Sequence, residues 1–252
     1  MRFRPSPCAC EALLAAVDGV LTAAGRGGDR VRPSPKGRGP VVKQVRAERT
    51  RSAVLVAAAN TFAEVGFESA SLVGISRRAG VSKGALYFHF VSKQALADGV
   101  RAAAGREIGS AALRALRTEG RPLQGLIDLS HELAGMLRED VVVRAGVRLG
   151  RYAARHEGLC PQGGDAPPGT DSTWRSLTAV VHRLLERAHD AGELCPGVDR
   201  RAAAELLTAV AAGQVLLAGG RPERLGPEGV RRVWTALLPA LVPLERVGAY
   251  AY

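Results

Sequence analysis

Residues 71–93, SLVGISRRAGVSKGALYFHFVSK, constrain the fold of this 252-residue chain more than any other stretch. Leu72, Ile75 and Ala79 recur at helical spacing, which indicates a short helix with one apolar face. Gly80 follows them, and glycine ends a helix in the left-handed conformation without a Cβ penalty. A second short helix begins two residues later. Two helices joined by so tight a turn predict a helix-turn-helix whose second helix enters the major groove of DNA.

The second helix has the composition that a groove-reading helix needs. Lys83 suits donation to guanine edges, and the absence of side-chain bulk at Gly84 and Ala85 permits close approach of the backbone. Leu86 is expected in the core. An ordinary helical hairpin with a solvated charged face is the alternative interpretation. The residues expected to meet DNA from this segment are Ser82, Lys83, Gly84, Ala85, Tyr87 and His89.

These residues resemble a known family. GVSKGALYFHFVSKQAL, together with the helix expected before it, resembles the DNA-binding domain of the tetracycline-repressor-like (TetR) family over about residues 43–104. The runs RAERTRSAVLVAAANTFAEVGFESASLVGI and GALYFHF look most like the γ-butyrolactone receptor group of that family. The resemblance supports Lys93, at the start of the next helix, as a phosphate clamp. It also implies a homodimer.

A helix is expected ahead of the motif, from Arg46 to Val65, with Gly66 as its stop. Its buried stripe should comprise Val54, Ala58, Phe62 and Val65. Arg46, Arg49 and Thr50 should flank the groove from this helix. Arg77 and Arg78, at the end of the following helix, are interpreted either as further contacts or as solvated charges.

The positive charge is concentrated in the first part of the chain. The net charge is +11, yet residues 105–252 carry 19 basic and 17 acidic residues and are close to neutral. Residues 41–104 carry nine basic and four acidic residues. Excess charge therefore lies where a phosphate backbone would be met.

Composition and periodicity divide the chain into three parts. Residues 1–40 contain GRGGDRVRPSPKGRGP and are expected to be a disordered basic extension. An inert tail or an artefact of an upstream start codon is favoured, and a basic tail that touches DNA is the alternative. Residues 41–104 form the expected DNA-binding domain, in which Ser92 caps a helix to about Arg106. Residues 105–252 show helical periods only, and the resemblance implies that they form a ligand-binding and dimerisation domain. The fold class is therefore all-α, with a three-helix helix-turn-helix domain followed by a larger helical domain.

The last two long helices, expected to begin at Asp199 and Pro227, are the proposed dimer interface. Residues 202–219, AAAELLTAVAAGQVLLAG, contain one charge and many small residues. Such a surface favours association of helices across a two-fold axis, and Leu206 and Leu207 are expected at the interface. The alternative is a core helix in a monomer.

A ligand cavity is expected in the second domain. Another helix, capped by Asp171 after a loop at 155–170, carries Trp174 on its apolar face. The γ-butyrolactone receptor group has a matching tryptophan that lines its pocket, so the resemblance implies a ligand contact here. Core packing is the alternative for this residue. The other expected walls are Val147, Leu149, Leu126 and Leu129.

No enzymatic or metal-binding pattern is found in the sequence. Five histidines and four cysteines are scattered without ligand spacing, and there is no P-loop, dinucleotide fingerprint or nucleophile elbow. No apolar run reaches the 18–20 residues or so that span a bilayer. We therefore expect a cytoplasmic protein that is no enzyme and uses neither cofactor nor metal.

The expected function is ligand-responsive repression. The resemblance implies binding to an inverted-repeat operator, release by a γ-butyrolactone or an antibiotic, and control of secondary-metabolite genes. Basic members of the group are more often pseudo-receptors, which answer to antibiotics, and the pI near 10.3 favours that variant. The alternatives are a repressor of a drug-efflux gene, whose cation pocket would use Glu132 or Asp128, and a DNA-architectural protein without a ligand.

Overall fold

The computed structural model describes residues 38–156, 172–218 and 221–252, and all regular structure in these ranges is helical, as predicted. Most of the basic extension, Asp171 and most of the loop expected at 155–170 lie outside the described residues. No described helix is long and apolar enough to cross a membrane. The elements are α2 (Arg38–Ser69), α3 (Leu72–Arg78), α4 (Lys83–His89), α5 (Lys93–Arg117), α6 (Pro122–Glu139), α7 (Val141–His156), α8 (Ser172–Asp190), α9 (Arg200–Leu217), η2 (Pro222–Arg224), α10 (Pro227–Leu241) and α11 (Leu244–Val247).

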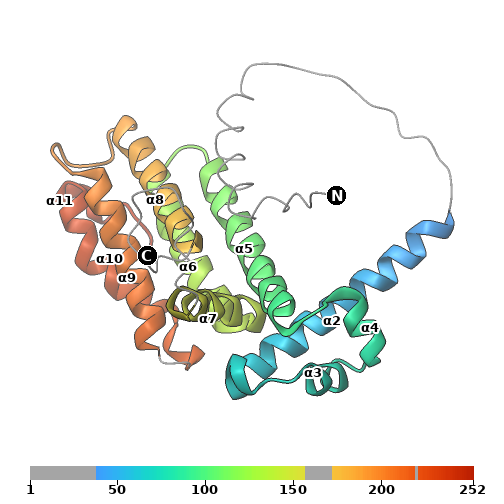
Figure 1. Ribbon diagram of the computed structural model, residues 1–252. Helices are drawn as coiled ribbons and strands as arrows, with labels where there is room; N and C mark the ends of the chain where they lie inside the picture. Colours follow the sequence, from blue (N-terminus) through green and yellow to red (C-terminus); the bar gives the residue numbers. More distant parts are fainter. Residues whose placement is uncertain (1–37, 157–171, 219–220) are drawn as a thin grey trace, which may run out of the picture.

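Helices α2, α3 and α4, with the start of α5, form a small unit that we call the head (Figure 1). Ile75 of α3 and Leu86 of α4 are fully buried beside Val54 of α2. Val65 was wrongly assigned to the buried stripe, because its side chain is 51% exposed. Gly66 interrupts α2 as expected, since its φ of 78° is left-handed, although the helix assignment continues across this kink to Ser69.

Helix α5 joins the head to the rest of the molecule. It runs to Arg117 and not to about Arg106, so the expected boundary at residue 104 falls inside one continuous helix (Figure 1). Its second half carries buried small side chains, among them Ala111 and Ala112, which let the bundle helices pack closely. Arg187 of α8 donates hydrogen bonds to the carbonyl oxygens of Leu116 and Thr118, at the end of α5.

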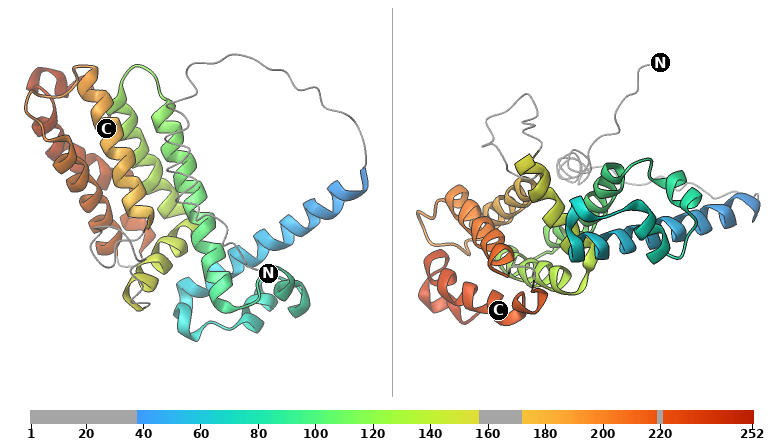
Figure 2. Two further views of the ribbon diagram at one scale, coloured as in Figure 1. Left: turned by 45° about the horizontal axis from the view of Figure 1, so that its top comes forward. Right: turned by 60° about the horizontal axis from the view of Figure 1, so that its bottom comes forward.

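The larger helical unit is a bundle of α6, α8, α9 and α10, and the distal half of α5 packs on α6 and α8 at its edge (Figure 2). Trp234 of α10 is 2% exposed, and its indole N–H donates to Ser130 Oγ of α6 at 2.8 Å. Asp199 caps α9 as predicted, because its carboxylate accepts from the backbone N–H of Arg201 and Ala202. Pro227 is the first residue of α10, also as predicted, where its missing N–H costs nothing.

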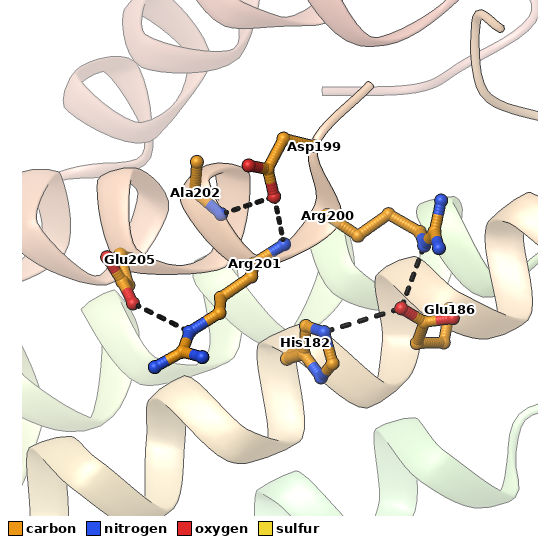
Figure 3. A network of polar contacts seen from close by, with 7 residues as sticks. All are labelled: His182, Glu186, Asp199, Arg200, Arg201, Ala202 and Glu205. Carbon is orange, nitrogen blue, oxygen red and sulfur yellow. Dashed lines mark hydrogen bonds and ion pairs between the residues drawn. The ribbon is translucent and has the colours of Figure 1, made fainter. Parts of the chain in front are cut away.

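An ionic link holds α8 to α9 (Figure 3). Glu186 of α8 accepts from Arg200 Nε of α9 at 2.7 Å, and His182 Nε2 lies 3.3 Å from the same carboxylate oxygen. The hydrogen bond from Arg200 is the main reason that the pKa of Glu186 lies below its ordinary value. All three side chains are about one third exposed or more, so water screens the link.

Helix α7 lies between the head and the bundle and packs on α5 and α2 (Figure 1). Ala145 and Leu149 belong to the core of the head, whereas Val147 belongs to a separate cluster on the bundle side. Leu149 was therefore wrongly predicted as a wall of the ligand cavity. Gly146 makes the contact with α5 possible, because a Cβ there would lie 2.4 Å from Ala104 Cβ and 3.1 Å from the carbonyl oxygen of Val100.

Candidate DNA-binding surface and ligand cavity

The helix-turn-helix has the turn that its sequence predicts. Ser71 Oγ accepts from the N–H of Gly74 and caps α3, and Ser82 Oγ accepts from the N–H of Ala85 and caps α4. Gly80 has a φ of 66°, in the left-handed region that glycine tolerates best.

The predicted reading residues of α4 lie mostly on its exposed face. Ser82, Lys83, Gly84 and Tyr87 are exposed, while Leu86 faces the core as expected. Lys83 Nζ lies 5.8 Å from the centroid of the Tyr87 ring, within the range of a cation–π contact. The exposed face therefore offers one cation and one phenol. Ala85 and His89 are half-buried at its margin.

Two exposed apolar side chains beside this face were missed. Phe88 is 82% exposed and Val91 is 79% exposed, whereas Phe90 between them is buried. The ring of Phe88 meets His89 edge to face at 5.2 Å. Helical periodicity contains the signal, because Leu86 and Phe90 are four residues apart on the buried side and Phe88 falls opposite them. An exposed phenylalanine next to a groove-reading helix suits contact with thymine methyl groups.

Arg46, Arg49 and Thr50 lie together on the N-terminal half of α2. Both arginines are exposed, and neither has a charged partner among the residues that the structure describes. The Thr50 hydroxyl donates to the carbonyl oxygen of Arg46 at 3.0 Å, which leaves only its acceptor capacity for another partner. The two arginines therefore remain available for phosphate, as the sequence predicts.

Lys93 is half-buried where α5 meets the end of α2. Its ammonium donates to the carbonyl oxygen of Glu68 at 2.8 Å and lies 4.7 Å from the centroid of the Phe67 ring. These contacts fasten α5 to the segment that follows the Gly66 kink, a structural role that the sequence did not predict. An ammonium has three donors, so a phosphate contact remains compatible with this geometry.

Arg78 turns out to be a structural residue. Its guanidinium makes two hydrogen bonds to Glu64 of α2, at 2.5 and 2.6 Å, and ties α3 to α2. The hydrogen bond from Arg78 lowers the pKa of the Glu64 carboxyl. Arg77 is exposed and has no such partner among the described residues. Of the two arginines, Arg77 is the one left free to meet DNA.

A cavity of about 100 Å³ lies inside the bundle. Leu126 and Leu129 of α6, Val147 of α7 and Trp174 of α8 all line it, so the structure brings together four of the five expected wall residues. Helices α9 and α10 close the remaining sides with residues that sequence reasoning missed, among them Gln214 and Trp234. The spacing of apolar residues in α9 and α10 did not predict which face of each helix lines a cavity.

The cavity wall is apolar, with a few uncharged polar groups. Ser130, Thr173, Thr208 and Gln214 carry them, in addition to the Trp234 indole. No described residue of the wall is charged. Leu207 is half-buried and also lines the cavity, whereas Leu206 is 52% exposed on the outer side of α9.

Comparisons with known proteins agree with this geometry. Residues 54–100 match the model of the family described as bacterial regulatory proteins, tetR family. The A-factor receptor protein of Streptomyces griseus is 35% identical over 202 residues, which cover 80% of this chain and 67% of that protein. This chain belongs to the TetR family. The TetR match spans α3, α4 and parts of α2 and α5, the elements that build the head.

Solved structures of TetR proteins extend the likeness to the whole described fold. A crystal structure of a γ-butyrolactone receptor, an ArpA-like protein, has a TM-score of 0.66 at 28% identity and covers 81% of this chain and 94% of its own. CprB of Streptomyces coelicolor, in complex with its operator sequence, gives a TM-score of 0.63 at 28% identity, with the same coverage. The bundle is thus shared with these TetR proteins, as well as the head.

Proposed function

We propose that this protein is a homodimeric TetR-type repressor that binds an inverted-repeat operator through α4 and is released by a small, uncharged, apolar ligand. In this proposal residues 41–104 are the DNA-binding domain and residues 105–252 the ligand-binding and dimerisation domain. The observation that carries it is the combination of an exposed groove-reading face on α4 with an apolar cavity in the bundle. A solved relative described by the control of antibiotic production by a bacterial hormone, 29% identical with a TM-score of 0.62, supports control of antibiotic biosynthesis genes.

The head supplies both kinds of DNA contact. Arg46 and Arg49 are placed for phosphates, which set affinity and its salt dependence. Lys83, Tyr87 and Phe88 are placed for base edges, which set specificity. CprB, a relative, was solved with its operator, which supports the same use of the shared fold.

The outer face of α9 supports the dimer. Ala202, Leu206, Ala209 and Leu217 are exposed on α9 at intervals of three, four and eight residues, and so form one stripe. Leu244, after α10, is also exposed. An apolar stripe of small and large residues suits helix packing across a two-fold axis. Two heads brought together in this way would meet half-sites about 34 Å apart.

The cavity favours an uncharged ligand over a lipophilic cation. A buried cation needs an acidic partner, because an unpaired charge in an apolar site is costly. Asp128 is exposed, and Glu132 pairs with Arg114, so neither candidate for a cation contact reaches the cavity wall. This argues against the efflux-pump alternative. The existence of a cavity argues against a purely architectural protein.

The cavity must widen to accept a ligand. Its volume of about 100 Å³ is below the roughly 300–1,000 Å³ of most ligand sites. Helix α7 is placed to carry such a movement to DNA, because Val147 lines the cavity while Ala145 and Leu149 lie in the core of the head. A ligand that prefers the widened state would then shift the heads away from the operator spacing.

Operator binding measured against salt tests this proposal. Fluorescence anisotropy with a labelled inverted-repeat duplex should give a log–log slope of about −0.9 for each phosphate neutralised. Lys83→Ala should lower affinity and relax sequence preference, whereas Arg49→Ala should weaken all duplexes alike and reduce the slope. Binding that is independent of salt, or equal losses of preference in both variants, would contradict the assignment.

A further inference from the structure

Gln214 is the one side-chain amide among the described residues of the cavity wall. It lies on α9, is half-buried, and donates through Nε2 to the carbonyl oxygen of Gly229 on α10 at 3.2 Å. A carbonyl oxygen can accept only from the NH₂ end of the amide, so this contact fixes which end is which. Among the described residues none donates to Gln214 Oε1, so this acceptor is free at the wall, together with the second N–H of the amide.

Two hydroxyl groups of the wall have already used their protons. Ser130 donates to the carbonyl oxygen of Ile127 at 2.6 Å and accepts from the Trp234 indole at 2.8 Å. Thr208 donates to the carbonyl oxygen of Ala204 at 2.8 Å. Thr173 also has an interaction of its own. The hydroxyls of Ser130 and Thr208 can therefore serve a ligand only as acceptors, as Gln214 Oε1 does.

We propose that Gln214 determines ligand specificity by accepting a hydrogen bond from a hydroxyl or N–H group of an otherwise apolar ligand. This inference rests on the proposed function, because it names the ligand chemistry of the same cavity. An apolar ligand without a donor leaves Gln214 Oε1 desolvated and unpaired, which weakens binding. A ligand with a donor satisfies that oxygen while its alkyl parts cover Leu126 and Leu129.

Two matched probes test the proposal on the full-length protein by isothermal titration calorimetry. One is an octyl γ-butyrolactone with a single hydroxyl group on its ring, and the other is the same lactone without the hydroxyl. The parent protein should prefer the hydroxylated lactone by about 5- to 50-fold, the range expected when a buried acceptor is either paired or left unpaired. Gln214→Met keeps an unbranched side chain of similar volume and removes the acceptor, so its preference should fall below about twofold.

Thr208→Val is the matched control, because it removes a hydroxyl from the same wall without changing its shape. It should keep the preference of the parent. Loss of preference in Thr208→Val but not in Gln214→Met would overturn the assignment, as would a parent that binds both lactones equally. The lactone without the hydroxyl should bind Gln214→Met at least as well as it binds the parent, which also shows that the variant is folded. Failure of both probes to bind the parent would contradict the proposed function as well as this inference.

Discussion

Gly146→Ala should separate α7 from α5. A Cβ at this position would lie 2.4 Å from Ala104 Cβ, whereas carbon atoms pack best at about 3.5–4.0 Å. The two helices must therefore move apart by about 1.1–1.6 Å or distort locally. Such overpacking costs about 1–3 kcal/mol, and the better helix propensity of alanine returns up to about 1 kcal/mol. We expect a net loss of about 1–2 kcal/mol.

Urea unfolding followed by circular dichroism measures that loss. Gly105→Ala on α5 is the matched control, because a Cβ there meets nothing within 4 Å. The control should gain up to about 1 kcal/mol, so the two variants should change stability in opposite directions. If Gly146→Ala is as stable as the parent, the contact between α7 and α5 is not as close as the structure indicates, and α7 is not a rigid link.

Two further predictions concern the bundle. Leu206→Arg should convert the dimer to monomers in sedimentation experiments and weaken operator binding, because it places a charge in the apolar stripe. If the variant stays dimeric with intact helicity, the interface lies elsewhere. Glu186→Gln should lower the stability of the protein above pH 4.5, because the contact of the carboxylate with Arg200 is lost. The difference in stability from the parent should vanish as the pH falls below 4.5, since a carboxyl group with a lowered pKa stabilises the fold only while it is ionised. A difference that persists in acid would refute this role.

The sequence predicted the head well because its signals are local. The cap at Ser92, the left-handed Gly80 and the buried Leu86 follow from the spacing of neighbouring residues. Val65 is 51% exposed although it is in helical register with Val54, Ala58 and Phe62, because the buried stripe ends before the kink at Gly66. Spacing alone does not show where a helix bends.

The bundle was harder to predict because its helices are apolar on more than one face. Leu206 and Leu207 are adjacent, yet the first is exposed and the second lines the cavity. Leu149 and Val147 lie on opposite sides of α7, and only the packing of that helix between two cores decides which meets the ligand. Gln214 Oε1 is the free end of its amide because the nitrogen donates to the carbonyl oxygen of Gly229 on α10. The sequence of α9 alone does not reveal a contact with another helix.

Lactone-induced release of the operator, compared between the parent protein and the Trp174→Ala variant, tests the central claim most directly. An octyl γ-butyrolactone with one hydroxyl group should lower the anisotropy of the labelled operator complex formed by the parent protein. Trp174→Ala should bind the operator and dimerise as before but require at least about tenfold more lactone, because the residue lines the cavity and does not touch the head. Release by the same lactone concentration in parent and variant would show that the switch does not act through this cavity.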